Sequence, residues 1–339
     1  MSRRLVPAAA PPTIDRSPPT VMIHLLATGG TIAMQRSPAA GGNVPALGAA
    51  ELVARVGGFD GGRELTVEDW ERLPGVHRGP AELWALRQRV AELVAGPAAP
   101  SGVVITHGTD TLEETAYLLA RTIPPRVPVV VTGAMRTSSD PDWDGPRNLR
   151  DAVRVAGHPE SRDRGTLVVF AGRIIDARFV VKVDSFQPDA FGSPHAPELG
   201  TVDDDGVDFE CSSPPHTLLP ARKLAARVGI VPLILGDDGR LLEAARELFD
   251  GVVIVGFGRG NIPPGALPAL RRWLDAGKPV VLASRCASGE VGGDYAFEGG
   301  GGELLRMGVI PAGARPVSLA RMELTLSISA GVPYGGNGT

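Results

Sequence analysis

The chain has 339 residues, of which 43% are hydrophobic and 21% charged, an ordinary globular balance in a length that suits two domains. A formal net charge of −4 gives no electrostatic reason to expect nucleic acid or an anionic membrane as a partner. No apolar run approaches the roughly 20 residues that a membrane span requires, so we expect a soluble protein.

The first twenty residues predict a disordered extension. They begin with Arg3 and Arg4 like a secretory signal, but five prolines stand where an apolar region would be needed. The two cysteines, Cys211 and Cys286, lie too far apart in sequence to suggest a disulfide framework or a zinc site. We expect two free thiols in a reducing cytosol, and therefore a cytoplasmic protein.

A recurring unit follows, made of a short β-branched run, a Gly-rich turn and, in places, an amphipathic stretch. Three such runs cover 21–27, 102–106 and 127–132, and a helical pattern begins at Leu112. This alternation predicts a mostly parallel sheet flanked by helices, with an α/β fold. Functional sites in such sheets gather at the carboxyl ends of the strands, where all three turns fall.

The second half of the chain predicts a smaller α/β unit. The pattern dissolves into Pro, Gly, Asp and Ser between about 186 and 222, and strand-like and helical stretches then alternate. The strands are expected at 228–235, 251–256 and 279–283, and the helices at 241–249 and 266–276. We therefore predict an N-terminal catalytic domain at 21–200, a linker at 201–226 and a C-terminal domain at 227–339.

The first Gly-rich turn, TGGT at 28–31, could carry a nucleophile. Its two glycines let the backbone turn sharply and bring amide N–H groups close to a ligand. The Thr31 hydroxyl just beyond them could attack a carbonyl carbon, with those amides holding the oxyanion. The alternative interpretation is a tight strand-to-loop turn without chemistry.

The second turn leads into a helix and carries three polar residues. In one interpretation Asp110 caps the helix, Glu113 completes a capping box, and His107 is structural. In the other, Thr109 and Asp110 project into a cleft, where the carboxylate binds an ammonium group and the hydroxyl relays a proton. Lys182 closes an apolar run and is either a surface residue or, if buried beside Asp110, a proton acceptor for Thr109.

Taken together, these segments resemble the bacterial L-asparaginases. The stretches LATGGTIA at 26–33 and ITHGTDTLEETAY at 105–117 are similar to the two signature segments of that family. Further matching segments occur in the same order, at 133–136 (GAMR), 144–149 (DGPRNL), Lys182 and 258–262 (GRGNI). The resemblance runs from about residue 21 to residue 320.

The resemblance implies a threonine amidohydrolase. Thr31 would attack the side-chain amide of L-asparagine, releasing ammonia and leaving an acyl-enzyme that water cleaves to L-aspartate. Thr109, Asp110 and Lys182 would form the family's catalytic group, with Asp110 also holding the substrate amino group. Asn261 would reach the active site of a neighbouring subunit, which implies a homodimer or homotetramer. The implied substrate-binding set also includes Gly30, Gly108 and Ala134, and no metal or organic cofactor is expected.

The sequence departs from the family pattern at two places. Family members usually carry a tyrosine on a mobile loop after the nucleophile, but here no tyrosine lies between Ile32 and Asp60, and the loop expected at 37–48 supplies no base. Tyr295 could substitute from another segment or subunit. The usual Ser-Gln pair for the substrate carboxylate is also replaced, so that the N–H groups of Gly75 and Val76, or the His77 ring, would bind it.

Other functions fit the sequence less well. The glycines at 256–261 do not complete a dinucleotide-binding pattern, since Asn261 stands where a glycine is required. There is no G-x-S-x-G elbow of a serine hydrolase. Two alternatives remain open: an amidase of the same fold acting on glutamine or another amide, and a slow or non-catalytic amino-acid-binding homologue. One methylene of side-chain length is worth only about 1–3 kcal/mol of discrimination.

Overall fold

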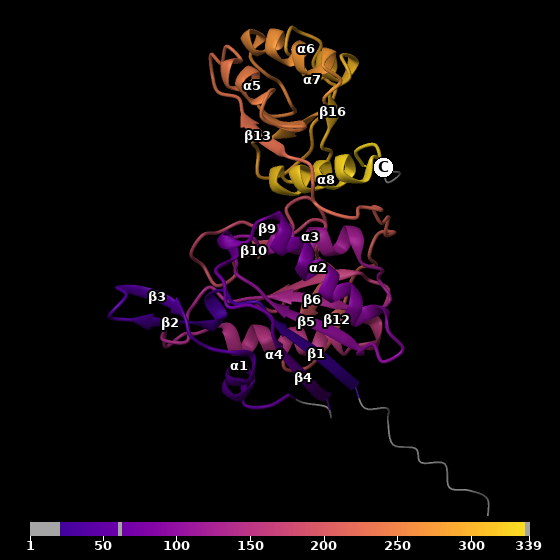
Figure 1. The fold of residues 1–339 in the computed structure, drawn as a ribbon. Helices are drawn as coiled ribbons and strands as arrows, with labels where there is room; N and C mark the ends of the chain where they lie inside the picture. Colours follow the sequence, from indigo (N-terminus) through magenta and orange to yellow (C-terminus); the bar gives the residue numbers. More distant parts are fainter. Residues whose placement is uncertain (1–20, 60–62, 336–339) are drawn as a thin grey trace, which may run out of the picture.

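The computed structural model describes residues 21–59 and 63–335 and confirms an α/β fold with a larger N-terminal and a smaller C-terminal sheet (Figure 1). The extension expected at 1–20 and the last four residues of the expected C-terminal domain lie outside the described residues. Among the described residues, no helix combines the length and the apolar character that crossing a bilayer would require.

The N-terminal sheet has eight strands in the order β12-β11-β8-β7-β6-β5-β1-β4. Neighbours from β4 to β7 are parallel, whereas β7, β8, β11 and β12 pair antiparallel, so the sheet is mixed and mostly parallel, as predicted. The strands are β1 (Val21–Ala27), β4 (Arg63–Asp69), β5 (Gly102–Thr106), β6 (Val129–Thr132), β7 (Thr166–Phe170), β8 (Arg173–Asp176), β11 (Gly200–Val202) and β12 (Val207–Phe209).

Helices cover both faces of this sheet because its central strands are apolar on both sides. Successive side chains of a strand point to opposite faces. Thus Val104 packs with Leu149 on one face, while Val103 and Ile105 pack with Leu112 on the other. The helices are α1 (Ala49–Val56) and α4 (Gly145–Ala156) on the first face, and α2 (Pro80–Ala95) and α3 (Leu112–Thr122) on the second.

Two small antiparallel pairs lie beside the main sheet. β2 (Met34–Ser37) and β3 (Gly42–Pro45) form a hairpin that projects from the body of the molecule (Figure 1). The expectation of a loop over 37–48 is therefore wrong for 42–45, where ladder hydrogen bonds to β2 outweigh the Gly- and Pro-rich composition. The second pair joins β9 (Val181–Lys182) to β10 (Phe191–Gly192).

The C-terminal sheet has four parallel strands in the order β13-β14-β15-β16. Val253 and Val281 pack against α8, whereas Ile254 and Leu282 face the other helices around Trp273. The predicted elements are found, with ends that differ by up to four residues. Their bounds are β13 (Val228–Pro232), α5 (Arg240–Ala245), β14 (Gly251–Gly256), α6 (Leu267–Asp275), β15 (Val280–Ser284), α7 (Gly301–Arg306), β16 (Ile310–Pro311) and α8 (Val317–Ala330).

The two parts meet where α8 lies against α3 (Figure 1). Glu323 of α8 has no exposed surface and accepts hydrogen bonds from Arg121 Nε and Nη2 and from the Tyr117 hydroxyl, all on α3. The part of the chain that the structure describes also contains four short 3-10 helices: η1 (Thr31–Ala33), η2 (Gly75–His77), η3 (Pro159–Ser161) and η4 (Pro264–Ala266). Cys211 and Cys286 are free thiols, as predicted.

Candidate active site

The three Gly-rich turns lie side by side at the carboxyl edge of the N-terminal sheet. β1 pairs with β5 so that Ala27 is opposite Thr106, and β5 pairs with β6 so that Thr106 is opposite Thr132. Each of these residues is the last of its strand. Because the strands are parallel and in register, the turns that follow them must leave the sheet next to one another.

The turns pack so closely that there is no room for a side chain where their backbones meet. A Cβ added to Gly30 would lie 2.5 Å from the Gly108 nitrogen, and one added to Gly133 would lie 2.6 Å from the carbonyl oxygen of His107. The same Gly133 position is 3.4 Å from Cγ2 of Thr109. Gly30 also has a φ of +90°, which side-chain-bearing residues rarely adopt. These glycines are therefore required for the close packing of the three turns against one another.

Lys182 joins the second turn through its side chain. Its Nζ lies 2.9 Å from Oγ1 of Thr109 and 3.1 Å from Oδ1 of Asp110. Thr109 is buried, with 5% of its surface exposed, whereas 65% of the Asp110 side chain is exposed. The structure thus brings together three of the four residues expected to be catalytic, with an amine between a hydroxyl and a solvent-facing carboxylate.

Glu113 fixes the backbone of Lys182 instead of capping the helix. Its Oε2 accepts a hydrogen bond of 2.7 Å from the Lys182 amide, and its Oε1 accepts one of 2.5 Å from the Ser318 hydroxyl of α8. Burial raises the pKa of the Glu113 carboxyl. The expected capping box of Asp110 and Glu113 is wrong: the cap residue of α3 is Thr111, without a side-chain cap hydrogen bond. Two donors from distant parts of the chain thus outweigh the local backbone donor as partners of Glu113.

The third turn is held by the next helix. Asp144 accepts hydrogen bonds from the amides of Met135 (3.0 Å) and Arg136 (2.9 Å), and Asn148 donates to the carbonyl of Gly133 at 3.1 Å. Ala134 within this turn is fully buried. The sequence segment at 144–149 therefore acts as a clamp on the turn at 133–136, a role that the residues alone did not reveal.

His107 is structural, as expected. It has no exposed surface, and its Nδ1 lies 2.9 Å from the Gly108 carbonyl oxygen. Its Nε2 lies 3.0 Å from the Thr115 hydroxyl and 3.4 Å from Nη1 of Arg78. Burial, reinforced by the Arg78 charge, lowers the pKa of His107 to about 4. The ring is therefore neutral at physiological pH and has no exposed face to offer a substrate.

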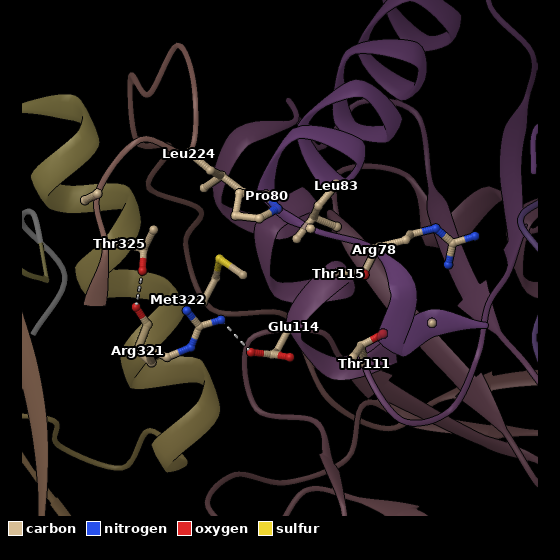
Figure 2. Close-up of a pocket in the computed structure, with 13 residues that line it drawn as sticks. Arg78, Pro80, Leu83, Thr111, Glu114, Thr115, Leu224, Arg321, Met322 and Thr325 are labelled. Carbon is tan, nitrogen blue, oxygen red and sulfur yellow. Dashed lines mark hydrogen bonds and ion pairs between the residues drawn. The ribbon is translucent and has the colours of Figure 1, made fainter. Parts of the chain in front are cut away.

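The segment proposed for the substrate carboxylate lies against the second turn. Gly75 is buried, and a Cβ on it would come within 2.6 Å of the Thr111 hydroxyl oxygen, whereas Val76 is 60% exposed. Gly75 and Thr111 also line a cavity of about 120 Å³ between the two parts of the chain, which Arg321 and Glu114 bridge by an ion pair of 2.9 Å (Figure 2).

Thr31 begins η1 and lines a second cavity of about 310 Å³. From the hairpin, Asn43 of β3 reaches this cavity, so the segment without a tyrosine still contributes a polar side chain beside Thr31. The lining also includes Arg136, whose guanidinium lies over the Phe186 ring at 4.3 Å. Thr31 thus borders a space large enough for a small amide, but Thr109, Asp110 and Lys182 are not among the residues that line it.

Asn261 is not brought to this site within its own chain. It follows β14 in the C-terminal part, and its Oδ1 accepts a hydrogen bond of 3.1 Å from the Gly301 amide at the start of α7. Tyr295 is 44% exposed and packs on Phe297 at 5.5 Å between ring centroids. Within residues 21–59 and 63–335, no group of three or more His, Cys, Asp or Glu side chains is arranged to hold a metal ion.

Known proteins share this architecture over most of the chain. Residues 22–215 match the family model described as asparaginase, N-terminal, and residues 227–333 match the glutaminase/asparaginase C-terminal domain. A probable L-asparaginase of Deinococcus radiodurans is 39% identical, covering 91% of this chain and 93% of that protein. An L-asparaginase of Bacillus licheniformis is 33% identical, covering 91% and 95%.

A solved structure agrees with the sequence matches. The crystal structure of a probable cytoplasmic L-asparaginase from Campylobacter jejuni superimposes with a TM-score of 0.80 at 31% identity, covering 91% of this chain and 95% of that chain. Both domains of the family are thus matched in one chain and in the same order. The chain therefore belongs to the L-asparaginase family of amidohydrolases.

Proposed function

We propose that this protein hydrolyses L-asparagine to L-aspartate and ammonia through an acyl-enzyme on Thr31. The observation that carries the proposal is the contact of Lys182 Nζ with both Thr109 Oγ1 and Asp110 Oδ1, beside the turn that presents Thr31. A binding protein would need the carboxylate for the substrate amine. It would not need a buried hydroxyl in contact with a lysine.

The chemistry follows in two steps. Thr31 Oγ adds to the amide carbon, its proton passes to the departing nitrogen, and ammonia leaves as the ester to Thr31 forms. Water then adds to the ester carbon, and cleavage returns the hydroxyl to Thr31 and releases aspartate. Amide N–H groups at Gly30, Gly108 and Thr109 are the proposed donors to the oxyanion, since backbone donors fixed before the reaction stabilise the charge that develops.

Thr109 and Lys182 are the proposed proton relay, and Asp110 is the proposed acceptor for the substrate α-amino group. Asp110 suits this role because most of its side chain faces solvent, so that an ammonium group could reach it. The amides of Gly75 and Val76 are the proposed donors to the substrate carboxylate. Ala134, buried in the third turn, is proposed to border the side-chain amide.

The proposal extends to assembly and location. We propose a homodimer or homotetramer in which Asn261 completes the site of a neighbouring subunit. Ile234 and Leu235 support an interface nearby, since they are 65% and 94% exposed and Leu235 shares a cavity of about 430 Å³ with Ile262. Two free thiols and the similarity to a probable cytoplasmic relative support a cytoplasmic location.

The test is a steady-state ammonia assay on L-asparagine, L-glutamine and their D-enantiomers, with the wild-type protein and Thr31→Ala. We expect release from L-asparagine and loss of turnover in Thr31→Ala without loss of folding, since a threonine at a partly exposed turn contributes little to stability. Thr31→Ala with a near-normal rate would refute the role of Thr31. Binding of asparagine without ammonia release would favour a binding protein, and preference for glutamine would favour the alternative amidase.

A further inference from the structure

We infer that Arg78 is a positioning residue that holds the nucleophile turn and the Thr109 turn in register, an inference that rests on the proposed function for its kinetic readout. Arg78 follows η2 and belongs to neither signature segment of the sequence. Only 3% of its side chain is exposed. Its guanidinium is directed away from Arg321 and Met322, toward the N-terminal sheet (Figure 2).

One guanidinium contacts both turns at their first residues. Nη2 donates to the carbonyl oxygen of Thr28, the residue that opens the turn to Thr31. Nη1 lies 3.4 Å from Nε2 of His107, the residue that precedes Gly108 and Thr109. Nε donates to Oε2 of Glu71 at 3.1 Å, which fixes the orientation of the guanidinium. The rigid, planar guanidinium can satisfy these three acceptors at once.

The contacts of His107 agree on one tautomer of the ring. The carbonyl oxygen of Gly108 can only accept, so Nδ1 carries the proton and donates to it at 2.9 Å. In the neutral ring Nε2 is then the acceptor, and it faces Nη1 of Arg78 and the Thr115 hydroxyl. Arg78 thereby acts on the peptide that leads into Thr109. The backbones of Gly108 and Gly30 are packed against each other. Arg78 therefore acts on both turns that meet there, through Thr28 in the first and through His107 in the second.

This arrangement predicts an effect on kcat rather than on KM. Asp110, which is proposed to bind the substrate amine, does not touch Arg78. The Arg78 guanidinium instead holds the carbonyl oxygen of Thr28, in the turn that leads into Thr31. A small displacement of a nucleophile costs up to about a hundredfold in rate. We therefore expect Arg78→Met to lower kcat by about tenfold or more with KM changed by less than about threefold.

The experiment compares Arg78→Met, Arg78→Lys and Glu71→Gln with wild type, with Arg72→Met as the matched control. Arg72 is on the same segment, but 53% of its side chain is exposed and its ion pair is with Asp69. We expect the largest kcat loss in Arg78→Met, partial recovery in Arg78→Lys, a smaller loss in Glu71→Gln, and none in the control. An Arg78→Met kcat within about twofold of wild type, measured on folded protein, would overturn the inference.

Amide hydrogen exchange gives a readout that needs no turnover. We expect Arg78→Met to speed exchange in peptides covering 28–33 and 107–111 while strands β6 and β7 stay protected, because loss of the guanidinium frees the turns and not the sheet. Unchanged exchange in both turns would overturn the inference. If the wild-type protein released no ammonia, the proposed function would fail, and the exchange data alone would decide whether Arg78 positions the turns.

Discussion

Gly30 and Gly108 touch through their backbones, although 77 residues separate them along the chain. A Cβ at Gly30 would lie 2.5 Å from the Gly108 nitrogen and 2.6 Å from its Cα. Both atoms belong to the main chain and cannot move aside without moving Thr109. We therefore expect Gly30→Ala to abolish turnover and to destabilise the protein by several kcal/mol, since it combines a steric clash with a strained φ.

Gly57 supplies the matched control for this substitution. It also has a positive φ, +81°, but a Cβ there would meet nothing within 4 Å. Gly57→Ala should therefore cost only the conformational strain, about 1–2 kcal/mol, with turnover unchanged. Ammonia assays and urea unfolding of both variants measure the two effects. Comparable losses of activity in Gly30→Ala and Gly57→Ala would show that the contact with Gly108 does not matter.

Glu323→Gln should weaken the joint between the two parts of the chain. Glu323 is fully buried and bonded to Arg121 through both carboxylate oxygens, at 2.8 and 2.9 Å. Removing its charge leaves the Arg121 guanidinium uncompensated in the interior, which typically costs about 3–5 kcal/mol. Glu247→Gln is the control, because 75% of its side chain is exposed in its ion pair with Arg246. Urea unfolding should show less than about 1 kcal/mol for that variant.

His107 should make the native state less stable in mild acid. Its pKa falls from an ordinary 6.5 to about 4 on folding. Above pH 6.5 the ring is neutral in both states. Between pH 6.5 and 4 His107 binds a proton in the unfolded chain, whereas the buried ring stays neutral. The free energy of unfolding therefore falls by up to about 3 kcal/mol over this range. His107→Gln should lack this loss, measured as the difference in unfolding free energy between pH 7.5 and pH 4.5. An equal loss in both proteins would contradict the assignment.

Asp151 should have the opposite pH dependence. It is 3% exposed, its Oδ2 accepts no hydrogen bond, and burial raises its pKa from 3.8 to about 6. Above pH 6 the folded protein holds this charge at a cost, and between pH 6 and 3.8 the native state takes up a proton and regains stability. Asp151→Asn should therefore stabilise the protein at pH 7.5 by up to about 3 kcal/mol, with little gain near pH 4.

The exposed Asp208 on β12 provides the comparison for Asp151. Asp208→Asn removes the same charge at a solvated position, so its effect on the unfolding free energy should stay within about 0.5 kcal/mol at both pH values. A stabilisation as large as that of Asp151→Asn would indicate a general effect of net charge on stability and not the burial of one carboxyl group.

The sequence by itself determined the fold class, the two sheets and the position of the candidate site along the chain. Apolar β-branched strands such as β5 can bury the side chains of both faces only between two layers of helices. The turns that follow parallel strands of this kind must then meet at one edge of the sheet. It also supplied the residues that make up the Thr109, Asp110 and Lys182 contact. It left open which strands of the mostly parallel sheet run antiparallel, namely β8, β11 and β12. It also missed that part of the loop after Thr31 is a strand.

Only the tertiary structure decided which partner each polar group takes. Glu113 has an available role as a local cap, yet it bonds to the Lys182 amide and to Ser318 of α8, both more than sixty residues away. Arg78 carries no signal in the sequence, yet it bonds to Thr28 and contacts His107. The local sequence shows which hydrogen bonds a side chain can donate or accept. Burial removes water as a competing partner, so a buried polar group must bond to another part of the protein. Which distant partner it finds depends on how the whole chain packs.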